Sequence, residues 1–259
     1  MSAKPIGIFD SGAGGLSIWK EISLLMPRES TAYISDAKYA PYGPKGKEAI
    51  IKRSIINTEK LLDMGAKIIV VACNTATTSA ITSLRKTYKV PFIGIEPAIK
   101  PAALATNTNK IGVLATKGTL SSTLFYKTSK KYTQNKTMLE IEGKGIVELI
   151  ESGKLHSQEM RKLLIESLKP VLDSPIDCLV LGCTHYHFLI PILRELLPKD
   201  IRIIDSGLAV ARHTQFILKK KALQNNSDKK GIHNFYTNGS VETMANLMGW
   251  KPTSINKTY

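Results

Sequence analysis

The chain has 259 residues, 43% hydrophobic and 22% charged, which is ordinary for a soluble globular protein with one large core or two modest ones. No apolar run approaches the roughly 20 residues that cross a bilayer, and residues 1–5 carry no apolar signal core, so we expect a cytoplasmic protein that does not enter a membrane. The 36 basic and 21 acidic residues give a formal charge of +15, which favours a lysine-rich solvated surface, with nucleic-acid binding as the alternative.

Strand-like and helical segments alternate along the first part of the chain. Apolar, β-branched runs predict strands at residues 6–9, 31–35, 67–72 and 91–95. Helical spacing of apolar residues predicts helices at residues 16–26, 50–64 and 77–88. This alternation is typical of parallel strands joined by crossover helices.

A second series of the same kind follows. It predicts strands at residues 110–115, 138–142, 178–181 and 201–204, and helices at residues 122–132, 146–151, 158–172 and 188–197. Residues 224–230 are polar and indicate an exposed loop. We interpret residues 235–248 as a strand and a helix that pack back on the first series.

The two series indicate one pattern used twice. Residues 6–9 match residues 111–114, Cys73 matches Cys183, and Glu96 matches Asp205, at offsets of 105 to 110 residues. Near-equal offsets in order favour a duplicated unit. We therefore predict an α/β fold of two pseudo-symmetric domains with mainly parallel sheets and a ligand cleft between them. The first domain comprises residues 1–97 and 207–259, and the second comprises residues 98–206.

Two cysteines occupy matching places in this pattern. Cys73 and Cys183 each follow a buried strand, and the C-terminal ends of parallel strands face the crevice where such sheets bind ligands. Two thiols that face one another can remove and return a proton on opposite faces of one carbon. Cys178 begins the strand that precedes Cys183, so we interpret it as a buried packing residue.

Polar residues surround both thiols. Asp10 and Ser11 open a glycine-rich turn whose N–H groups can approach an anion, and Asp10 is either a helix N-cap or a carboxylate that steers proton transfer. Asn74, Thr75 and Thr184 suit helix N-caps and carboxylate binding alike. His185 can tune or relay the proton of Cys183. The rigid loop with Tyr42 and Gly43 is either a plain turn or a cover for the ligand.

These segments together resemble the glutamate racemases of the aspartate/glutamate racemase superfamily. The resemblance covers residues 5 to 218 and is carried by IGIFDSGAGGL at 6–16, PYG at 41–43, ACNTA at 72–76 and LGCTHY at 181–186. It implies a cofactor-independent, two-base interconversion of L- and D-glutamate, with D-glutamate used for peptidoglycan. It also implies a homodimer and no metal.

The resemblance assigns roles to residues at matching positions. Cys73 and Cys183 are the implied proton donor and acceptor, and Asp10 and His185 are their respective auxiliaries. The implied substrate-binding residues are Asp10, Ser11, Tyr42, Gly43, Asn74, Thr75, Thr184 and His185. Glu151 loosely matches a further family acid. His187 stands where the family usually has proline, which can alter the start of the next helix.

Three other interpretations remain open at this point. A related racemase can act on another amino acid such as aspartate. Cys183, His185 and His187, at every second position, can be interpreted as ligands of a metal ion, although their spacing is not that of a structural zinc site. The third interpretation is a nucleic-acid-binding protein without enzymatic activity, which the net charge of +15 suggests.

Overall fold

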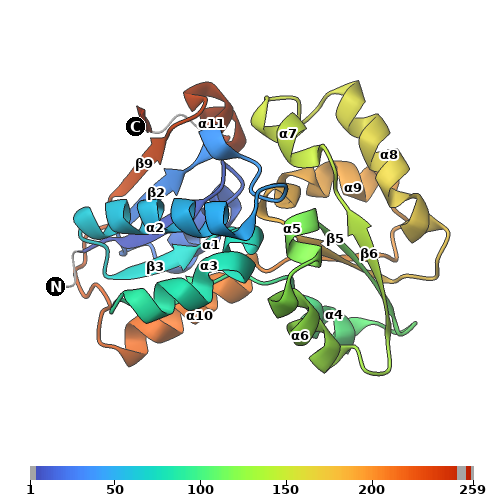
Figure 1. Cartoon of the computed structure of the whole chain (residues 1–259), viewed down its shortest axis with the longest axis horizontal. Coiled ribbons are helices and arrows are strands. Elements are labelled where there is room, and N and C mark those ends of the chain that lie inside the picture. Colours follow the sequence, from blue (N-terminus) through green and yellow to red (C-terminus); the bar gives the residue numbers. More distant parts are fainter. Residues whose placement is uncertain (1–3, 250–254, 258–259) are drawn as a thin grey trace.

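The computed structural model describes residues 4–249 and 255–257. Residues 1–3, part of the segment in which we looked for a signal core, lie outside these ranges. Within these residues, ten strands form two separate sheets. Neighbouring strands in each sheet are parallel. Figure 1 shows the sheets as the centres of two lobes placed side by side.

The first lobe contains the six-stranded sheet, in the order β10-β9-β2-β1-β3-β4. Its elements before the crossover are β1 (Ile6–Asp10), α1 (Leu16–Leu25), β2 (Thr31–Ser35), the 3-10 helix η1 (Ala37–Tyr39), α2 (Lys47–Asp63), β3 (Ile68–Val71), α3 (Asn74–Thr87) and β4 (Phe92–Gly94). The chain returns to it with α10 (Gly207–Lys220), β9 (His233–Thr237), α11 (Val241–Met248) and β10 (Ile255–Lys257). The strand and helix predicted within residues 235–248 thus pack on the first lobe as expected.

The second lobe contains the four-stranded sheet, in the order β6-β5-β7-β8. Its elements are α4 (Ile99–Ala105), β5 (Lys110–Ala115), α5 (Lys117–Leu120), α6 (Thr123–Tyr132), β6 (Thr137–Glu142), α7 (Ile146–Glu151), α8 (Gln158–Leu172), β7 (Cys178–Gly182), the 3-10 helix η2 (Thr184–Leu189), α9 (Ile190–Leu196) and β8 (Arg202–Ile204). The order β6-β5-β7-β8 repeats the order β2-β1-β3-β4 of the first lobe, in agreement with the duplicated sequence pattern.

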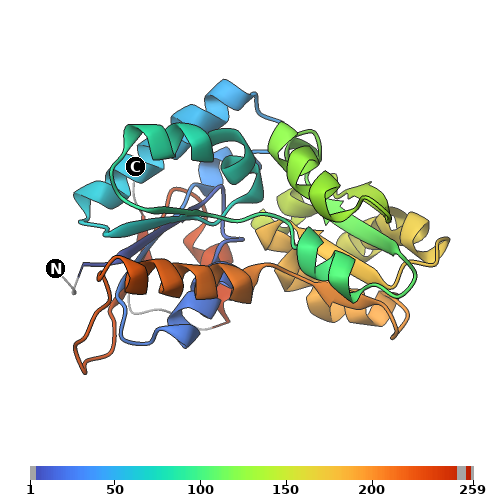
Figure 2. The same ribbon diagram turned by 90° about the horizontal axis from the view of Figure 1, so that it is seen from below.

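Helices cover both faces of the six-stranded sheet, with α2 and α3 on one side and α1 and α10 on the other (Figure 2). The central strands β1 and β3 are therefore buried along their whole length, which explains their continuous apolar sequence. The predicted α/β class with parallel sheets is confirmed. We propose domain borders after residues 97 and 206, where β4 leads to α4 and β8 leads to α10.

Several element predictions need correction. Helix α3 begins at Asn74 and not at residue 77, because the sulfur of Cys73 caps it by accepting the Ala76 N–H at 3.4 Å. The segment predicted as a helix at 188–197 begins as η2, which contains His187, and becomes α-helical only at Ile190. Helices α4, α5 and α10 were not predicted. Among the described residues, no helix is long and apolar enough to span a membrane.

Candidate active site

A small cavity lies between the two lobes, where strands of both sheets end. Ser11, Cys73, Thr116 and Cys183 each follow the C-terminal end of a strand and line it. The remaining lining residues are Pro41, Tyr42, Gly43, Asn74, Thr75, Val147, Thr184 and His185. Its volume of about 10 Å³ holds roughly one water molecule, so the site is closed. Of the site residues predicted from the sequence, Asp10 alone does not line the cavity.

Cys73 is held in an acidic and dry environment. The residue is 5% exposed, and its sulfur lies 3.5 Å from the hydroxyl oxygen of Ser11. Burial, and then the nearby carboxylate of Asp10, raise the pKa of Cys73 well above that of a free thiol. Cys73 is therefore a thiol at neutral pH.

Asp10 is hydrogen-bonded to residues of both lobes. Its carboxylate accepts hydrogen bonds from the hydroxyls of Ser11 at 3.0 Å and Thr184 at 2.7 Å, the second across the interface. Burial raises the pKa of Asp10, and the charge of His185 and the bond from Thr184 oppose this rise. Asp10 does not cap α1, because that helix begins after Gly15, so its interpretation as an N-cap was wrong.

Cys183 has the opposite electrostatic environment. Its sulfur lies 3.8 Å from Nδ1 of His185, and Nε2 of that ring lies 2.6 Å from a carboxylate oxygen of Glu151. Burial alone would lower the pKa of His185, but the contacts with Cys183 and Glu151 raise it well above its usual value. His185 thus connects the sulfur of Cys183 to the carboxylate of Glu151.

The glycine-rich turn makes room for this histidine and this glutamate. A Cβ on Gly12 would lie 2.0 Å from Oε1 of Glu151, and one on Gly14 would lie 2.3 Å from Nδ1 of His185. The N–H of Ala13 donates to Oε1 of Glu151 at 2.6 Å. The anion that the turn binds is thus a carboxylate of the second lobe.

Asn74 and Thr75 follow Cys73 at the start of α3, and Cys73 itself is the N-cap. Cys183 likewise precedes η2, which begins at Thr184, so the N-cap interpretation was wrong for all three residues. Both amide atoms of Asn74 are buried without a hydrogen-bond partner among the described residues. Since Asn74 lines the cavity, its amide is available to a ligand.

Two threonines of the second lobe, Thr116 and Thr119, lie close to Thr75 and were not predicted from the sequence. The hydroxyl of Thr116 lies 2.8 Å from that of Thr75 and 3.2 Å from that of Thr119, which also lies 3.4 Å from Thr75. Thr116 follows β5 as Ser11 follows β1, so the repeat offset of 105 residues contained a signal for it. Tyr42 directs its hydroxyl to Asp36 at 2.5 Å and contributes to the cavity wall.

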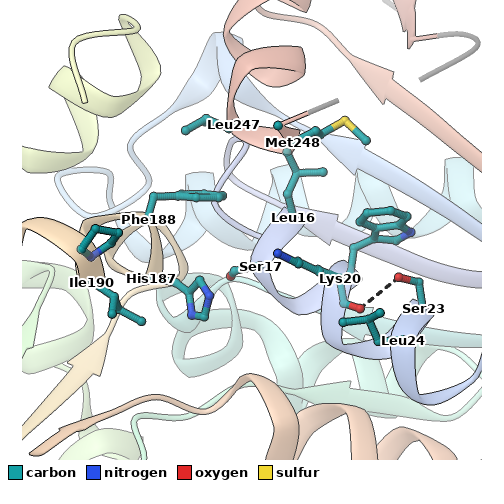
Figure 3. Close-up of a pocket in the computed structure, with 13 residues that line it drawn as sticks. Leu16, Ser17, Lys20, Ser23, Leu24, His187, Phe188, Ile190, Leu247 and Met248 are labelled. Atoms are coloured by element: carbon teal, nitrogen blue, oxygen red, sulfur yellow. Dashed lines mark hydrogen bonds between the residues drawn. The ribbon is translucent and has the colours of Figure 1, made fainter. Parts of the chain in front are cut away.

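The described residues form no metal site here, but a cavity of about 380 Å³ shares Pro41, Gly43, Thr116 and Val147 with the thiol cavity. Within residues 4–249 and 255–257, no three histidine, cysteine or acidic side chains are placed to hold a metal ion; His187 lies 3.7 Å from Asp205 instead. A cavity of about 700 Å³ lies between α1, η2 and α11, lined by Leu16, Phe188 and Met248 among others (Figure 3). Neither Cys73 nor Cys183 lines this larger cavity.

Two thiols in one interlobe cavity are what the resemblance to racemases implies, and comparison with known proteins identifies the family. The profile described as "Asp/Glu/Hydantoin racemase" matches residues 23–214. The chain belongs to this racemase family, as the sequence motifs implied.

Several relatives that match most of this chain are named glutamate racemase. The glutamate racemase of Stutzerimonas stutzeri is 43% identical over 247 residues, covering 95% of this chain and 93% of the relative. Among solved structures, a glutamate racemase of Bacillus anthracis has a TM-score of 0.88 at 29% identity, covering 100% of this chain and 98% of its own. The Escherichia coli glutamate racemase, solved with L-glutamate and the activator UDP-MurNAc-Ala, has a TM-score of 0.83 at 33% identity, covering 95% and 92%.

Proposed function

We propose that this protein interconverts L- and D-glutamate, with Cys73 and Cys183 as the two proton-transfer groups. The observation that carries the proposal is that both cysteines line one closed cavity, from opposite lobes. The relatives named glutamate racemase support glutamate as the substrate. No comparison favours the alternative of aspartate.

The environments of the two thiols suggest how a turnover begins. We assign the base to Cys183, whose sulfur lies 3.8 Å from Nδ1 of His185, and the acid to Cys73, whose pKa is raised. The Cys183 thiolate takes the α-proton from the enantiomer that presents it, and the Cys73 thiol delivers its own proton to the opposite face of the carbon. One proton is taken and one is given, and the reverse reaction exchanges the roles.

Removal of an α-proton needs a stabilised carboxylate and the exclusion of water. We assign carboxylate binding to the amide of Asn74, which has no partner among the described residues, and to the hydroxyls of Thr75 and Thr116, which line the cavity. The hydroxyl of Thr184 already donates to Asp10. The closed cavity supplies the exclusion of water. Because a cavity of about 10 Å³ is too small for glutamate, the lobes must separate for substrate to enter.

Further parts of the proposal rest on the family and on the chemistry. The proton balance closes with two thiols, so we propose that no cofactor takes part. Free thiols persist in a reducing compartment, which supports a cytoplasmic location. D-Glutamate for peptidoglycan synthesis and a homodimer remain predictions from the resemblance, and nucleic-acid binding remains a prediction from charge alone.

Circular dichroism tests the proposal by following L-glutamate without added cofactor and in the presence of a chelator. We expect the signal to decay to that of the racemate. L-Aspartate and L-alanine are the comparison substrates, and much faster turnover of either would contradict the assignment of glutamate. Salt-dependent binding to duplex DNA without any racemisation would favour the nucleic-acid alternative.

A further inference from the structure

The segment between β2 and α2 forms one wall of the catalytic cavity and meets the second lobe (Figure 1). Pro41, Tyr42 and Gly43 line the cavity from this segment. The two lobes approach closely at one point of this segment, because a Cβ on Gly118 would lie 2.9 Å from the carbonyl oxygen of Gly43. The position of this segment therefore sets the dimensions of the closed cavity.

Arg53, on α2, holds this segment at two points. Its guanidinium donates to both oxygens of Asp36, from Nη2 at 2.6 Å and from Nε at 2.8 Å. It also lies over the ring of Tyr39, 3.8 Å from the centroid. Bidentate pairing and stacking on an aromatic ring both require the planar guanidinium, which lysine lacks.

The same carboxylate holds Tyr42. The side chain of Asp36 is fully buried and accepts the Tyr42 hydroxyl at 2.5 Å and the amide of Asn238 at 2.6 Å. Burial and the charge of Asp36 keep the pKa of Tyr42 far above neutral pH, so this hydroxyl remains a donor. Contacts therefore run without interruption from Arg53 through Asp36 to a ring that lines the cavity.

We propose that Arg53 is a positioning residue for racemisation, holding Asp36 and thereby Tyr42 and the 41–43 wall in the arrangement that closes around the substrate. The inference rests on the proposed function. Arg53 does not line the catalytic cavity, so its effect is exerted through the wall. A wall that contacts the substrate equally before and during proton transfer changes KM more than kcat.

Kinetics of Arg53→Met test the proposal. We expect KM for glutamate to rise about tenfold with kcat within about threefold of the wild type, and Arg53→Lys to give a smaller rise in KM. The matched control is Lys67→Met, which breaks the other buried ion pair of the first lobe, between Lys67 and Glu29 at 2.6 Å. Lys67→Met should lose thermal stability and keep the wild-type KM.

Tyr42→Phe removes one hydroxyl and tests the same link if Arg53→Met does not fold. We expect its KM to rise as well, because the bond to Asp36 is lost. An unchanged KM in folded Arg53→Met or in Tyr42→Phe would overturn the proposal. An equal rise in KM in Lys67→Met would also overturn it, since the effect would then be a general loosening of the lobe.

Limited trypsin digestion gives a readout that does not depend on the substrate. Lys38 and Lys45 lie in the 36–46 segment, so we expect faster cleavage after them in Arg53→Met than in the wild type or Lys67→Met. Equal cleavage rates in Arg53→Met and the wild type would contradict the proposal that Arg53 holds this segment. A wild-type protein that does not racemise glutamate would refute the proposed function, while the digestion would still decide whether Arg53 holds this segment.

Discussion

Replacement of Glu151 by glutamine tests the electrostatic role given to His185. The carboxylate of Glu151 lies 2.6 Å from Nε2 of His185, and glutamine keeps the shape while removing the charge. A hydrogen bond between charged groups contributes about 1.5–3 kcal/mol. Because the Glu151 side chain is 15% exposed, we use the lower end of that range, which corresponds to about a tenfold effect on a rate.

The sign follows from the raised pKa of His185. In the wild type the imidazolium, and the stability that it adds, persist at neutral pH and are lost only as pH rises through that raised pKa. In Glu151→Gln the pKa of His185 falls, so His185 loses its proton at a lower pH than it does in the wild type. We therefore expect kcat/KM to fall by about tenfold at alkaline pH, with a smaller loss at lower pH.

Racemisation measured by circular dichroism from each enantiomer, across neutral and alkaline pH, gives the required profiles. Glu159→Gln is the control, because Glu159 forms a largely exposed ion pair with Lys154 on the second lobe. Its profile should match the wild type. Superimposable profiles of Glu151→Gln and wild type, or an equal loss at every pH, would refute the role of Glu151 in holding the imidazolium.

Four further substitutions have distinct expected outcomes. Cys73→Ser and Cys183→Ser should each abolish racemisation yet favour elimination of HCl from opposite enantiomers of β-chloroglutamate; near-wild-type racemisation in either would exclude that cysteine. Gly14→Ala places a Cβ 2.3 Å from His185, and a strain of about 1–3 kcal/mol should lower kcat/KM by tenfold or more in steady-state assays; unchanged kinetics would contradict this. Asn74→Ala should raise KM about tenfold through a lost bond to a charged group without lowering the melting temperature, whereas an unchanged KM would remove Asn74 from substrate binding.

The positions of the thiols could be predicted from sequence because they depend on local pattern. Each follows a buried β-branched run, and the structure places both where parallel strands end at the interlobe cavity. The duplicated pattern predicted two similar α/β domains, and four strands of the first sheet have the same order as the four strands of the second. The start of α3 was predicted three residues late because a cysteine is not a usual N-cap, and Cys73 fills that position.

Contacts between distant segments could not be predicted in the same way. Arg53 lies on a charged helix with nothing in its local sequence to distinguish it from solvated cations. Its partner Asp36 is 17 residues away, and Asn238, which completes the carboxylate's environment, is 202 residues from Asp36. Such a cluster exists only once the sheet has brought β9 beside β2. Glu151 was matched only loosely through the resemblance, and nothing in its local sequence predicts its contact with His185.

The two lobes are nearly equivalent in topology, but the chemistry of their thiols differs, and the difference depends on closure. Asp10 of the first lobe is bound by Thr184 of the second, and Glu151 of the second is bound by the Ala13 N–H of the first. Each auxiliary acid thus takes a hydrogen bond from the opposite lobe. Separation of the lobes to admit glutamate would break both bonds. Closure of the lobes would therefore form both bonds in the same movement that excludes water from the substrate.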